Sequence, residues 1–440
     1  MDALKKFIIS LIIIVLSVAS GSACNFSLKK YLITDYGAID DGQTVNTIAI
    51  QTAVDKCSTE GGGEVIIPKG SFLSGAIFLR KGVDLYVENN GVLKGTTNQA
   101  DYPQVQTRWE GVDCKWTSAL VNAVDLKGVK ISGEGTIDGS GTAWPKTQRL
   151  TRQQWDQLSQ ADRDSLMKIP RIGRPRLICF QNCTNVSITD IKLLNQAVWC
   201  LHILYCSEVS VKNLIIRADH TILSSDGIDI DSSNGVLISG CDIDVNDDCI
   251  SIKSGKDEDG LRVNRPSENI IIEKCRFGYG HGGVAMGSET SGGIRKVEVR
   301  NCIADSGNWA PIRFKTQPSR GNVIEDIVYR DIQIKNVNQA FEFNMEWRMV
   351  PPIAPPAKVL PIIRNIKIIN ISGTAGSVGY ISGLKDSPVE NIQFTNCNIT
   401  AKKGLITNHI KNINFSGLKL NVQEGPEIVQ KESSQTIQTK

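Results

Sequence analysis

One short unit recurs along most of this sequence, and it constrains the fold more than any other feature. The unit usually begins with an Asn, a Gly or an acidic residue and continues with an alternating β-branched triplet and a short second strand. Copies begin at Gly128, Asn185, Glu208, Gly235, Asn269, Lys296, Asp326, Asn365, Asn391 and Asn412. From Asn185 onward the steps between copies are 23, 27, 34, 27, 30, 39, 26 and 21 residues.

Spacings of about 20 to 40 residues indicate a repeat architecture, and each copy here offers strands but no helix. The copies lack the Leu and Asn frame of a leucine-rich repeat and the four strands of a propeller blade. A right-handed parallel β-helix fits, because each coil would add short strands to the next and bury aliphatic ladders along one core. We therefore predict an all-β, single-domain solenoid over residues 24–422.

Three segments depart from the repeat. Residues 44–57, "TVNTIAIQTAVDKC", have helical spacing and predict a helix that caps the first coil. Residues 144–175 are predicted to be an insertion, in which a Thr-x-x-Gln box at Thr151 opens a helix beside a groove. Residues 423–440 are polar and predict a disordered tail.

The composition is typical of a β-rich chain with many turns: 41% hydrophobic residues, 6% aromatic residues and 39 glycines. The charges nearly cancel, with 49 Lys and Arg against 46 Asp and Glu and a net charge of +3. Because no basic block or basic-aromatic stripe is present, nucleic acid is excluded as a partner.

Residues 1–23 follow the plan of a secretory signal peptide. Two lysines precede the apolar run "FIISLIIIVLSV", and small residues lead to Cys24. The run of about 12 apolar residues is too short to span a bilayer. We predict export to the periplasm or the exterior, without a transmembrane segment. Cleavage before Cys24 would also allow a lipid anchor, although Gly21 stands where the lipid-attachment motif has Leu.

The sequence has 12 cysteines at irregular spacings and no CxxC pair. Several follow a predicted strand, as in "SGCDI" and "EKCRF". This recurring position favours buried small residues in stacked turns, with disulfides as the second interpretation.

Residues at equal positions of successive coils lie about 4.8 Å apart, so the aligned repeats predict contacts. The strands "DGIDID", "DDCISIK", "HGGVAMG", "APIRFK" and "QAFEFN" align without gaps. One predicted inward ladder contains Ile228, Ile250, Val284, Ile312 and Phe341. The next contains Ile230, Ile252, Met286, Phe314 and Phe343.

The same register brings titratable groups together at the strand entrances. Asp226 lies level with Asp248, and Asp247 lies level with His281. One outward row is predicted to hold Asp229, Ser251, Ala285, Arg313 and Glu342. The other is predicted to hold Asp231, Lys253, Gly287, Lys315 and Asn344, with His202 added by the preceding strand. A single Asp at a strand entrance is usually a turn residue, but turn residues have no reason to gather on adjacent rungs. We predict a polar groove for an anionic ligand.

Carboxylates without a Ser/His/Asp triad or a nucleophilic Cys indicate glycoside hydrolysis. The pair Asp247 and Asp248 beside Asp226 predicts one carboxyl group with a raised pKa, as a general acid requires. The rival interpretation is a Ca²⁺ site that supports β-elimination on an anionic sugar. We favour the hydrolase and expect no metal and no cofactor.

Four segments carry a resemblance to a known family. "SSDGIDID", "NDDCISIKSG", "GHGGVAMGS" and "IRFK" resemble, in order and interval, the signature segments of the polygalacturonase family, glycoside hydrolase family 28. "TDYGAIDDG" and "GEGTIDGSG" extend the resemblance over nearly the whole mature chain. It implies hydrolysis of α-1,4-galacturonosyl linkages in pectin. The segments after His281 and after the Asp-Asp strand are more similar to the exo-acting branch that trims oligogalacturonides.

The resemblance implies that Asp247 is the general acid, that Asp226 and Asp248 activate water with inversion, and that His281 tunes the acid. Stacking alone leaves inversion and retention open, because it does not decide the distance between the carboxyl groups.

The resemblance further implies that Arg313 and Lys315 bind the galacturonate carboxylate. Lys253, His202 and Trp347 complete the predicted substrate-binding set, with Trp347 as a stacking platform. Two positions depart from the family pattern: Ser224 and Ser225 replace Asn-Thr, and Phe314 replaces Ile. Neither change removes a charged residue.

Two alternatives to a polygalacturonase remain open from the sequence. Hydrolases of rhamnogalacturonan are an alternative, although they generally lack the His and the Arg-x-Lys pair. A polysaccharide lyase or a non-catalytic carbohydrate-binding solenoid is the second alternative. Exo or endo action depends on whether loops such as 144–175 and 345–358 close one end of the groove. The expected partner is a pectic polysaccharide or oligosaccharide bound by a monomer.

Overall fold

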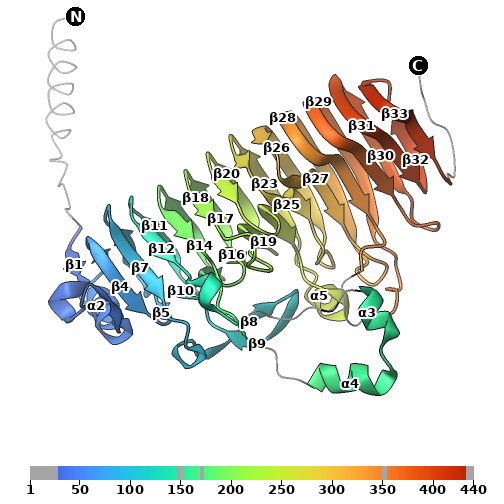
Figure 1. Cartoon of the computed structure of the whole chain (residues 1–440). Helices are drawn as coiled ribbons and strands as arrows, with labels where there is room; N and C mark the ends of the chain where they lie inside the picture. Colours follow the sequence, from blue (N-terminus) through green and yellow to red (C-terminus); the bar gives the residue numbers. More distant parts are fainter. Residues whose placement is uncertain (1–27, 146–149, 151, 169–172, 349–353, 433–440) are drawn as a thin grey trace, which may run out of the picture.

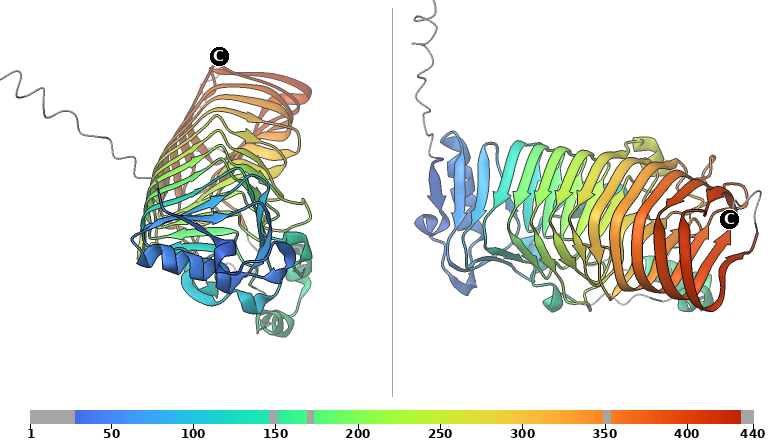
Figure 2. Two further views of the ribbon diagram at one scale, coloured as in Figure 1. Left: turned by 90° about the vertical axis from the view of Figure 1, so that its left-hand side faces the viewer. Right: turned by 90° about the horizontal axis from the view of Figure 1, so that it is seen from above.

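A computed structural model describes residues 28–145, 150, 152–168, 173–348 and 354–432. Within them, 31 strands pair into one continuous sheet that winds round the molecular axis, and every pairing between coils is parallel. Figures 1 and 2 show the resulting elongated solenoid, a parallel β-helix with the right-handed crossover that parallel strands adopt. The fold class predicted from the repeat is confirmed.

The strands form three ladders along this axis. The first, which carries the candidate site, contains β5 (Ile77–Phe78), β10 (Val121–Val124), β13 (Ile178–Gln181), β16 (Leu201–Leu204), β19 (Ile228–Asp231), β22 (Ile250–Lys253), β25 (Gly280–Met286) and β27 (Asn308–Lys315). The second contains β1 (Lys30–Leu32), β3 (Gly63–Ile67), β6 (Val83–Val87), β11 (Lys127–Ser132), β14 (Thr184–Thr189), β17 (Ser207–Lys212), β20 (Asn234–Ser239), β23 (Ser267–Glu273), β30 (Val389–Thr395) and β32 (Ile410–Asn414). The third contains β2 (Asp41–Val45), β4 (Gly70–Ser74), β7 (Gly91–Gly95), β12 (Thr136–Asp138), β15 (Lys192–Leu194), β18 (Ile215–Arg217), β21 (Asp242–Asp244) and β24 (Arg276–Phe277). Five longer strands bend between ladders: β26 (Ile294–Ala304), β28 (Val323–Asn344), β29 (Ile362–Ser382), β31 (Cys397–Asn408) and β33 (Leu418–Gln430).

The residue that opens each repeat turns the chain at a corner of the coil. All ten opening residues have a left-handed backbone, with φ between 51° and 74°. Asn and Gly adopt this conformation at little cost, which explains their recurrence at this step. On the later coils the asparagines also stack: Asn391 Nδ2 donates to Asn365 Oδ1 at 3.3 Å, and Asn412 Nδ2 donates to Asn391 Oδ1 at 2.7 Å.

The interior holds the two aliphatic ladders in the predicted register. Ile228 pairs with Ile250 and Ile230 with Ile252, and the pairing continues unshifted to Phe341 and Phe343 on β28. All ten side chains are completely buried. Stacked Phe rings continue the core, with 4.2 Å between the centroids of Phe314 and Phe343.

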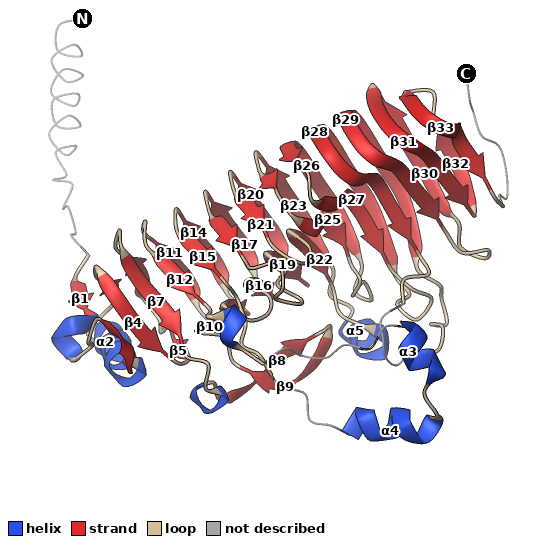
Figure 3. Ribbon diagram, in the orientation of Figure 1, coloured by secondary structure: helices blue, strands red, loops and turns tan. Residues whose placement is uncertain are grey.

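Helices lie at one end and along one side of the solenoid (Figure 3). The predicted cap is α2 (Thr47–Thr59), which covers the first coil with Ile50, Ala53, Val54 and Cys57. The insertion contains two helices, α3 (Arg152–Gln157) and α4 (Gln160–Lys168), where one was predicted. Ser159 explains the break, since its Oγ accepts a hydrogen bond from the Asp162 amide as a new N-cap. Thr151 lies outside the described residues.

The remaining helices are η1 (Ile33–Tyr36), η2 (Gln99–Asp101), η3 (Gly141–Ala143) and α5 (Asp257–Val263). The antiparallel hairpin of β8 (Gln104–Trp109) and β9 (Val112–Thr117) stands apart from the solenoid sheet. It contacts α5, because the Asp113 amide donates to Asp259 Oδ2 at 3.0 Å.

The described cysteines bear out the first interpretation of the Cys pattern. All 11 are free thiols, and all except Cys114 are buried. Residues 1–27, with the predicted signal peptide and Cys24, lie outside the described residues. Strand β33 continues to Gln430, into the segment expected to be a disordered tail. In the described part of the chain, no helix is long and apolar enough to cross a membrane.

Candidate active site

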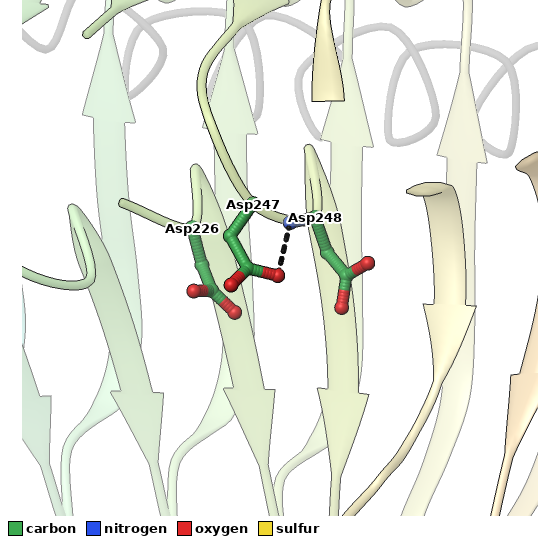
Figure 4. A group of neighbouring side chains, drawn as sticks. All are labelled: Asp226, Asp247 and Asp248. Atoms are coloured by element: carbon green, nitrogen blue, oxygen red, sulfur yellow. Dashed lines mark hydrogen bonds between the residues drawn. The ribbon is translucent and has the colours of Figure 1, made fainter. Parts of the chain in front are cut away.

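Three aspartates converge where β19 and β22 begin. Asp226 precedes β19, and Asp247 and Asp248 precede β22. One carboxylate oxygen of each lies within 4.8 Å of the others. Figure 4 shows the carboxylates of Asp226 and Asp247 facing the same space, with the Asp248 amide donating to Asp247 Oδ1 at 3.0 Å. The Asp-Asp dipeptide thus joins two neighbouring rungs, as the register predicted.

Asp248 is the buried anchor of this cluster. Arg313 Nη1 donates to its Oδ1 at 3.0 Å, and Lys315 Nζ donates to its Oδ2 at 2.5 Å. Burial opposes ionisation, but the charges of Lys315 and Arg313 hold the pKa of Asp248 below its usual range. Trp347, half-buried, lies under both cations, with its ring centroid 4.9 Å from Arg313 and 5.4 Å from Lys315. The predicted cations and platform therefore form one unit with Asp248.

The pKa values of Asp247 and Asp226 are shifted in opposite directions. Burial would raise the pKa of Asp247, but the hydrogen bond with His281 holds it well below the usual range. His281 Nδ1 lies 3.3 Å from Asp247 Oδ1, and this contact raises the pKa of His281. Burial, and next the charge of Asp247, raise the pKa of Asp226 to about 7. One carboxyl group does have a raised pKa, but it is that of Asp226 and its first cause is burial, whereas the pKa of Asp247, the implied general acid, is lowered in the free protein.

The three aspartates also have the donor chemistry of a cation site, since hard cations prefer carboxylate oxygens. Both oxygens of Asp248 are already used by Arg313 and Lys315, and Lys253 Nζ lies 3.7 Å from Asp226 Oδ2. Three basic side chains at this cluster supply the positive charge that a cation would otherwise bring.

The outward rows follow the predicted register but are not an open groove. Asp229 pairs with Ser251, and Asp231 with Lys253. The hairpin β8–β9 covers this part of the sheet: Arg108, itself fully buried, donates from Nη1 to Asp231 Oδ1 at 2.8 Å and from Nε to Asp113 Oδ1 at 3.0 Å. Asp229, Ser251, Asp231 and Lys253 thus form a buried polar layer under the hairpin, together with Arg108. We call it the buried layer.

His202 was predicted to lie in the outward row of Asp231, and this was wrong. His202 pairs with Asp229, not with Asp231, because the turn before β16 places the strand two residues differently. The ring is 0% exposed and packs edge-on against Trp199, with 5.2 Å between centroids. Arg176 Nη1 donates to its Nδ1 at 2.6 Å, and burial lowers its pKa to about 4. A neutral, enclosed His202 supports the buried layer and offers no surface to a ligand.

Lys253 is also part of the buried layer. Its Nζ lies 3.4 Å from Asp229 Oδ1 and 3.4 Å from Glu289 Oε2, and it sits 4.8 Å from the ring centroid of Trp199. Lys253 therefore neutralises carboxylates beneath the site.

Most of the chain matches a known family. Residues 57–422 match the glycosyl hydrolases family 28. The chain belongs to this family. It is therefore a glycoside hydrolase.

Individual proteins that are similar to this chain are polygalacturonases and related enzymes. A probable polygalacturonase of Vitis vinifera is 28% identical over 398 residues, which cover 88% of this chain and 77% of the relative. An exo-poly-alpha-D-galacturonosidase of Dickeya chrysanthemi is 26% identical, with 89% and 71% covered. The crystal structure of a hyperthermoactive exopolygalacturonase of Thermotoga maritima superposes with a TM-score of 0.77 at 29% identity, covering 89% of this chain and 92% of that one.

The sequence did not predict which end of the active site of this glycosyl hydrolase is closed. The row of strand entrances contains, from the N-terminal side, Val198, Ser225, Asp247, His281 and Trp309, as the neighbouring pairings place them. The first two are buried, whereas side-chain exposure rises to 20% at Asp247 and 52% at His281, and Trp309 is 47% exposed. The site is closed towards the N-terminal coils and open towards the C-terminal coils.

Trp199 forms the closed end. It lies level with Asp226 on the preceding rung, because the Cys200 amide donates to the Asp226 carbonyl at 2.8 Å. Trp109 of the hairpin packs on it with 4.8 Å between centroids, and Trp116 stacks on Trp109 at 5.0 Å. The alignment of "NWAPIRFK" with "HGGVAMG" could have found Trp309, since it places this residue next to His281. No local signal links the hairpin to Trp199.

Proposed function

We propose that this glycosyl hydrolase cleaves α-1,4-galacturonosyl linkages of polygalacturonate or its oligosaccharides. The observation that supports this substrate is the cation pair Arg313 and Lys315, held beside the three carboxylates. Both cations are largely buried, and Arg313 also contacts Glu342, but each keeps donors after these contacts because a guanidinium has five N–H groups and an ammonium three. An anionic sugar carboxylate can share these donors, and Trp347 can stack against the ring.

Asp247 acts as the general acid in this proposal. It is the most exposed of the three aspartates and contacts His281. In the free protein the nearby cations favour its ionised form. A galacturonate carboxylate on Arg313 and Lys315 cancels part of that positive charge, which raises the proton affinity of Asp247, and protonated His281 is a proton donor within reach. Binding of an anionic substrate thus prepares the acid.

Asp226 and Asp248 hold the attacking water in this proposal, since each Asp248 oxygen keeps a second lone pair beside its contact with Arg313 or Lys315. Asp226, which has the raised pKa, takes the proton of the water. With two carboxylates for water and one for the leaving oxygen, the proposal predicts inversion at the anomeric carbon. The distance of at most 4.8 Å between the carboxylate oxygens is closer to the value of about 5 Å seen in retaining enzymes than to the 6.5 to 9.5 Å usual for inversion. Proton NMR of the first-formed sugar anomer decides between the two outcomes, and retention would remove the water-activating role from Asp226 and Asp248.

The proposed action is from a chain end. The closed end at Trp199 leaves room for few sugar units beyond Asp226, whereas the open side at His281 and Trp309 can accept a longer chain. The exopolygalacturonase that this chain resembles is in keeping with this mode. Oligogalacturonates of defined length test it: an exo enzyme releases one short product from every length, and a random product ladder would contradict chain-end action.

The reaction itself is tested on polygalacturonate. Hydrolysis releases reducing ends without the ultraviolet absorbance of an unsaturated sugar and continues in EDTA. Asp247→Asn should abolish turnover while substrate binding persists. Asp305→Asn is a matched control, because Asp305 is similarly half-buried and ion-paired, with Arg276 at 2.6 Å, but lies away from the site. Absorbance at the product's double bond would indicate a lyase, and activity only on rhamnogalacturonan would indicate the other hydrolase.

The proposal includes export and a monomeric enzyme. The N-terminal signal pattern supports export, and cell fractionation with size-exclusion chromatography of the mature chain tests both statements.

A further inference from the structure

Asp229 carries a carboxyl group beneath Asp226, the proposed water-activating residue, and has no part in the proposed reaction. It lies on β19, two positions before Asp231 in the buried layer. Its side chain is 0% exposed. Among the described residues, no N–H or O–H group donates a hydrogen bond to either of its oxygens. A fully buried carboxylate without a donor is costly, so its charge state needs an explanation.

The groups that face Asp229 do not provide enough positive charge. Lys253 contacts three carboxylates: Asp229 at 3.4 Å, Glu289 at 3.4 Å and Asp226 at 3.7 Å. Glu289 also receives charge stabilisation from Arg320, so Asp229 and Asp226 are left to share the one ammonium of Lys253, with one carboxylate charge too many in a buried layer. A bound proton removes part of this imbalance.

The other neighbours of Asp229 are neutral or turned elsewhere. On β22 the Ser251 hydroxyl donates to the Gly287 carbonyl at 2.9 Å. On the β16 side, His202 is directed to Arg176, and the thiol of Cys200 is buried. Asp231, on the same strand, is paired with Arg108. No second cation among the described residues forms an ion pair with Asp229.

Asp229 is the member of the three that takes the proton. Glu289 receives charge stabilisation from Lys253 and next from Arg320, and its pKa is lowered although burial opposes this. The pKa of Asp229 is raised well above its usual range, first by burial and second by Asp226. Both carboxyl groups lie beside the same Lys253 ammonium, at 3.4 Å for Asp229 and 3.7 Å for Asp226, and a side-chain hydrogen bond with Asp226 further raises the pKa of Asp229. Two carboxyl groups form such a bond only when one of them carries a proton.

We propose that Asp229 is a positioning residue that stays protonated at working pH and donates its O–H to the Asp226 carboxylate. This inference rests on the proposed role of Asp226. The donated hydrogen bond favours the ionised form of Asp226 and fixes one of its oxygens, so that the other faces the water. The polar layer beneath the site therefore sets the proton affinity of the water-activating carboxylate.

Two variants test whether Asp229 acts as a neutral hydrogen-bond donor or as a negative charge. Asp229→Asn keeps the size and a neutral N–H donor, whereas Asp229→Leu keeps a similar volume without a donor. We expect Asp229→Asn to keep at least a third of kcat, and Asp229→Leu to lose about 30-fold or more in kcat with KM changed less than threefold. The acidic limb of the kcat/KM profile should move to higher pH in Asp229→Leu only, since Asp226 then loses a donor to its ionised form.

Equal, severe losses in both variants would overturn the proposal, because the ionised form of Asp229 would then be needed. Full activity of Asp229→Leu would overturn it as well. An infrared spectrum of the full chain gives a readout independent of turnover: at pH 8 the wild type should show the carbonyl band of a buried protonated carboxyl group, and Asp229→Asn should lack it. A wild-type spectrum without this band would contradict the proposal even if the variants lose activity.

The failure of the proposed function is distinguishable from these outcomes. If Asp247→Asn cleaves polygalacturonate as fast as the wild type, the proposed function fails, whatever the two Asp229 variants do. If Asp247→Asn is inactive and the infrared band is missing, only the role of Asp229 fails.

Discussion

Gly282 faces the carboxylate of Asp248, and replacing it with Ala is the most direct test of the geometry of the site. Gly282 lies between Asp248 and Ala310 in the row that carries the catalytic carboxylates. A Cβ atom at this position would lie 2.7 Å from Asp248 Oδ1 and 3.2 Å from Arg313 Cδ. Its backbone is outside the left-handed region, so Ala itself causes no backbone strain.

The magnitude follows from the crowding. Real Cβ atoms essentially never approach another atom closer than 3.0 Å, and ordinary contact begins at 3.4 Å. From 2.7 Å the Asp248 carboxylate therefore has to move by about 0.3 to 0.7 Å, roughly half an ångström. It cannot move freely, because it is buried and held by Arg313 and Lys315. A misplacement of about 1 Å can cost about 100-fold in rate, so this shift predicts about a tenfold loss in kcat, equivalent to about 1.4 kcal/mol.

The assay is reducing-sugar release from polygalacturonate, with thermal unfolding as the check on folding. Ala310→Gly, which removes a methyl group on the next rung of the same row, is the matched control and should stay within about twofold of the wild type. A folded Gly282→Ala enzyme with unchanged kcat would refute the reasoning, because Asp248 would then tolerate displacement.

Three further predictions follow from the same contacts. Lys315→Met should lower kcat/KM on polygalacturonate by about 10- to 150-fold, since a hydrogen bond to a charged group contributes about 1.5 to 3 kcal/mol, and the loss should be smaller on methyl-esterified substrate; equal losses on both substrates would contradict carboxylate recognition. His281 has a raised pKa in the folded protein, so its charged form is complete below about pH 6.5 and is lost as the pH rises through the raised value; activity should fall along this basic limb, and His281→Gln should abolish the limb. Arg108→Met should destabilise the protein by about 3 to 5 kcal/mol in denaturant unfolding because it leaves Asp231 buried and unpaired, whereas Arg295→Met on the surface should cost less than about 1 kcal/mol. The pKa of Asp231 is depressed, so the stability from its pair is present above about pH 3.9 and lost on further acidification, and an unchanged acid transition in Arg108→Met would contradict this.

The register of the site strands was predictable because its causes are local. Alternation places Ile228 and Ile250 inside, and the residues that open each repeat take a left-handed turn whatever the rest of the chain does. Stacking equal positions then placed Asp226 beside Asp248 and Asp247 beside His281. The error at His202 arose at a turn without a repeat signature, where a shift of two residues keeps the same inward pattern but changes the row.

The sequence by itself thus determined the β-helix, its two aliphatic ladders, and the meeting of three aspartates with a histidine and two cations. Only the tertiary structure decided which polar residues are open to a ligand. A hairpin at residues 104–117 covers strands far along the chain, seals the row at Trp199, and turns Asp229, His202 and Lys253 into a buried layer. Local periodicity reports which way a side chain points relative to its own strand. It does not report what distant segment lies above it. Burial raises the pKa of Asp226, whereas His281 and the cations of later coils hold the pKa values of Asp247 and Asp248 down.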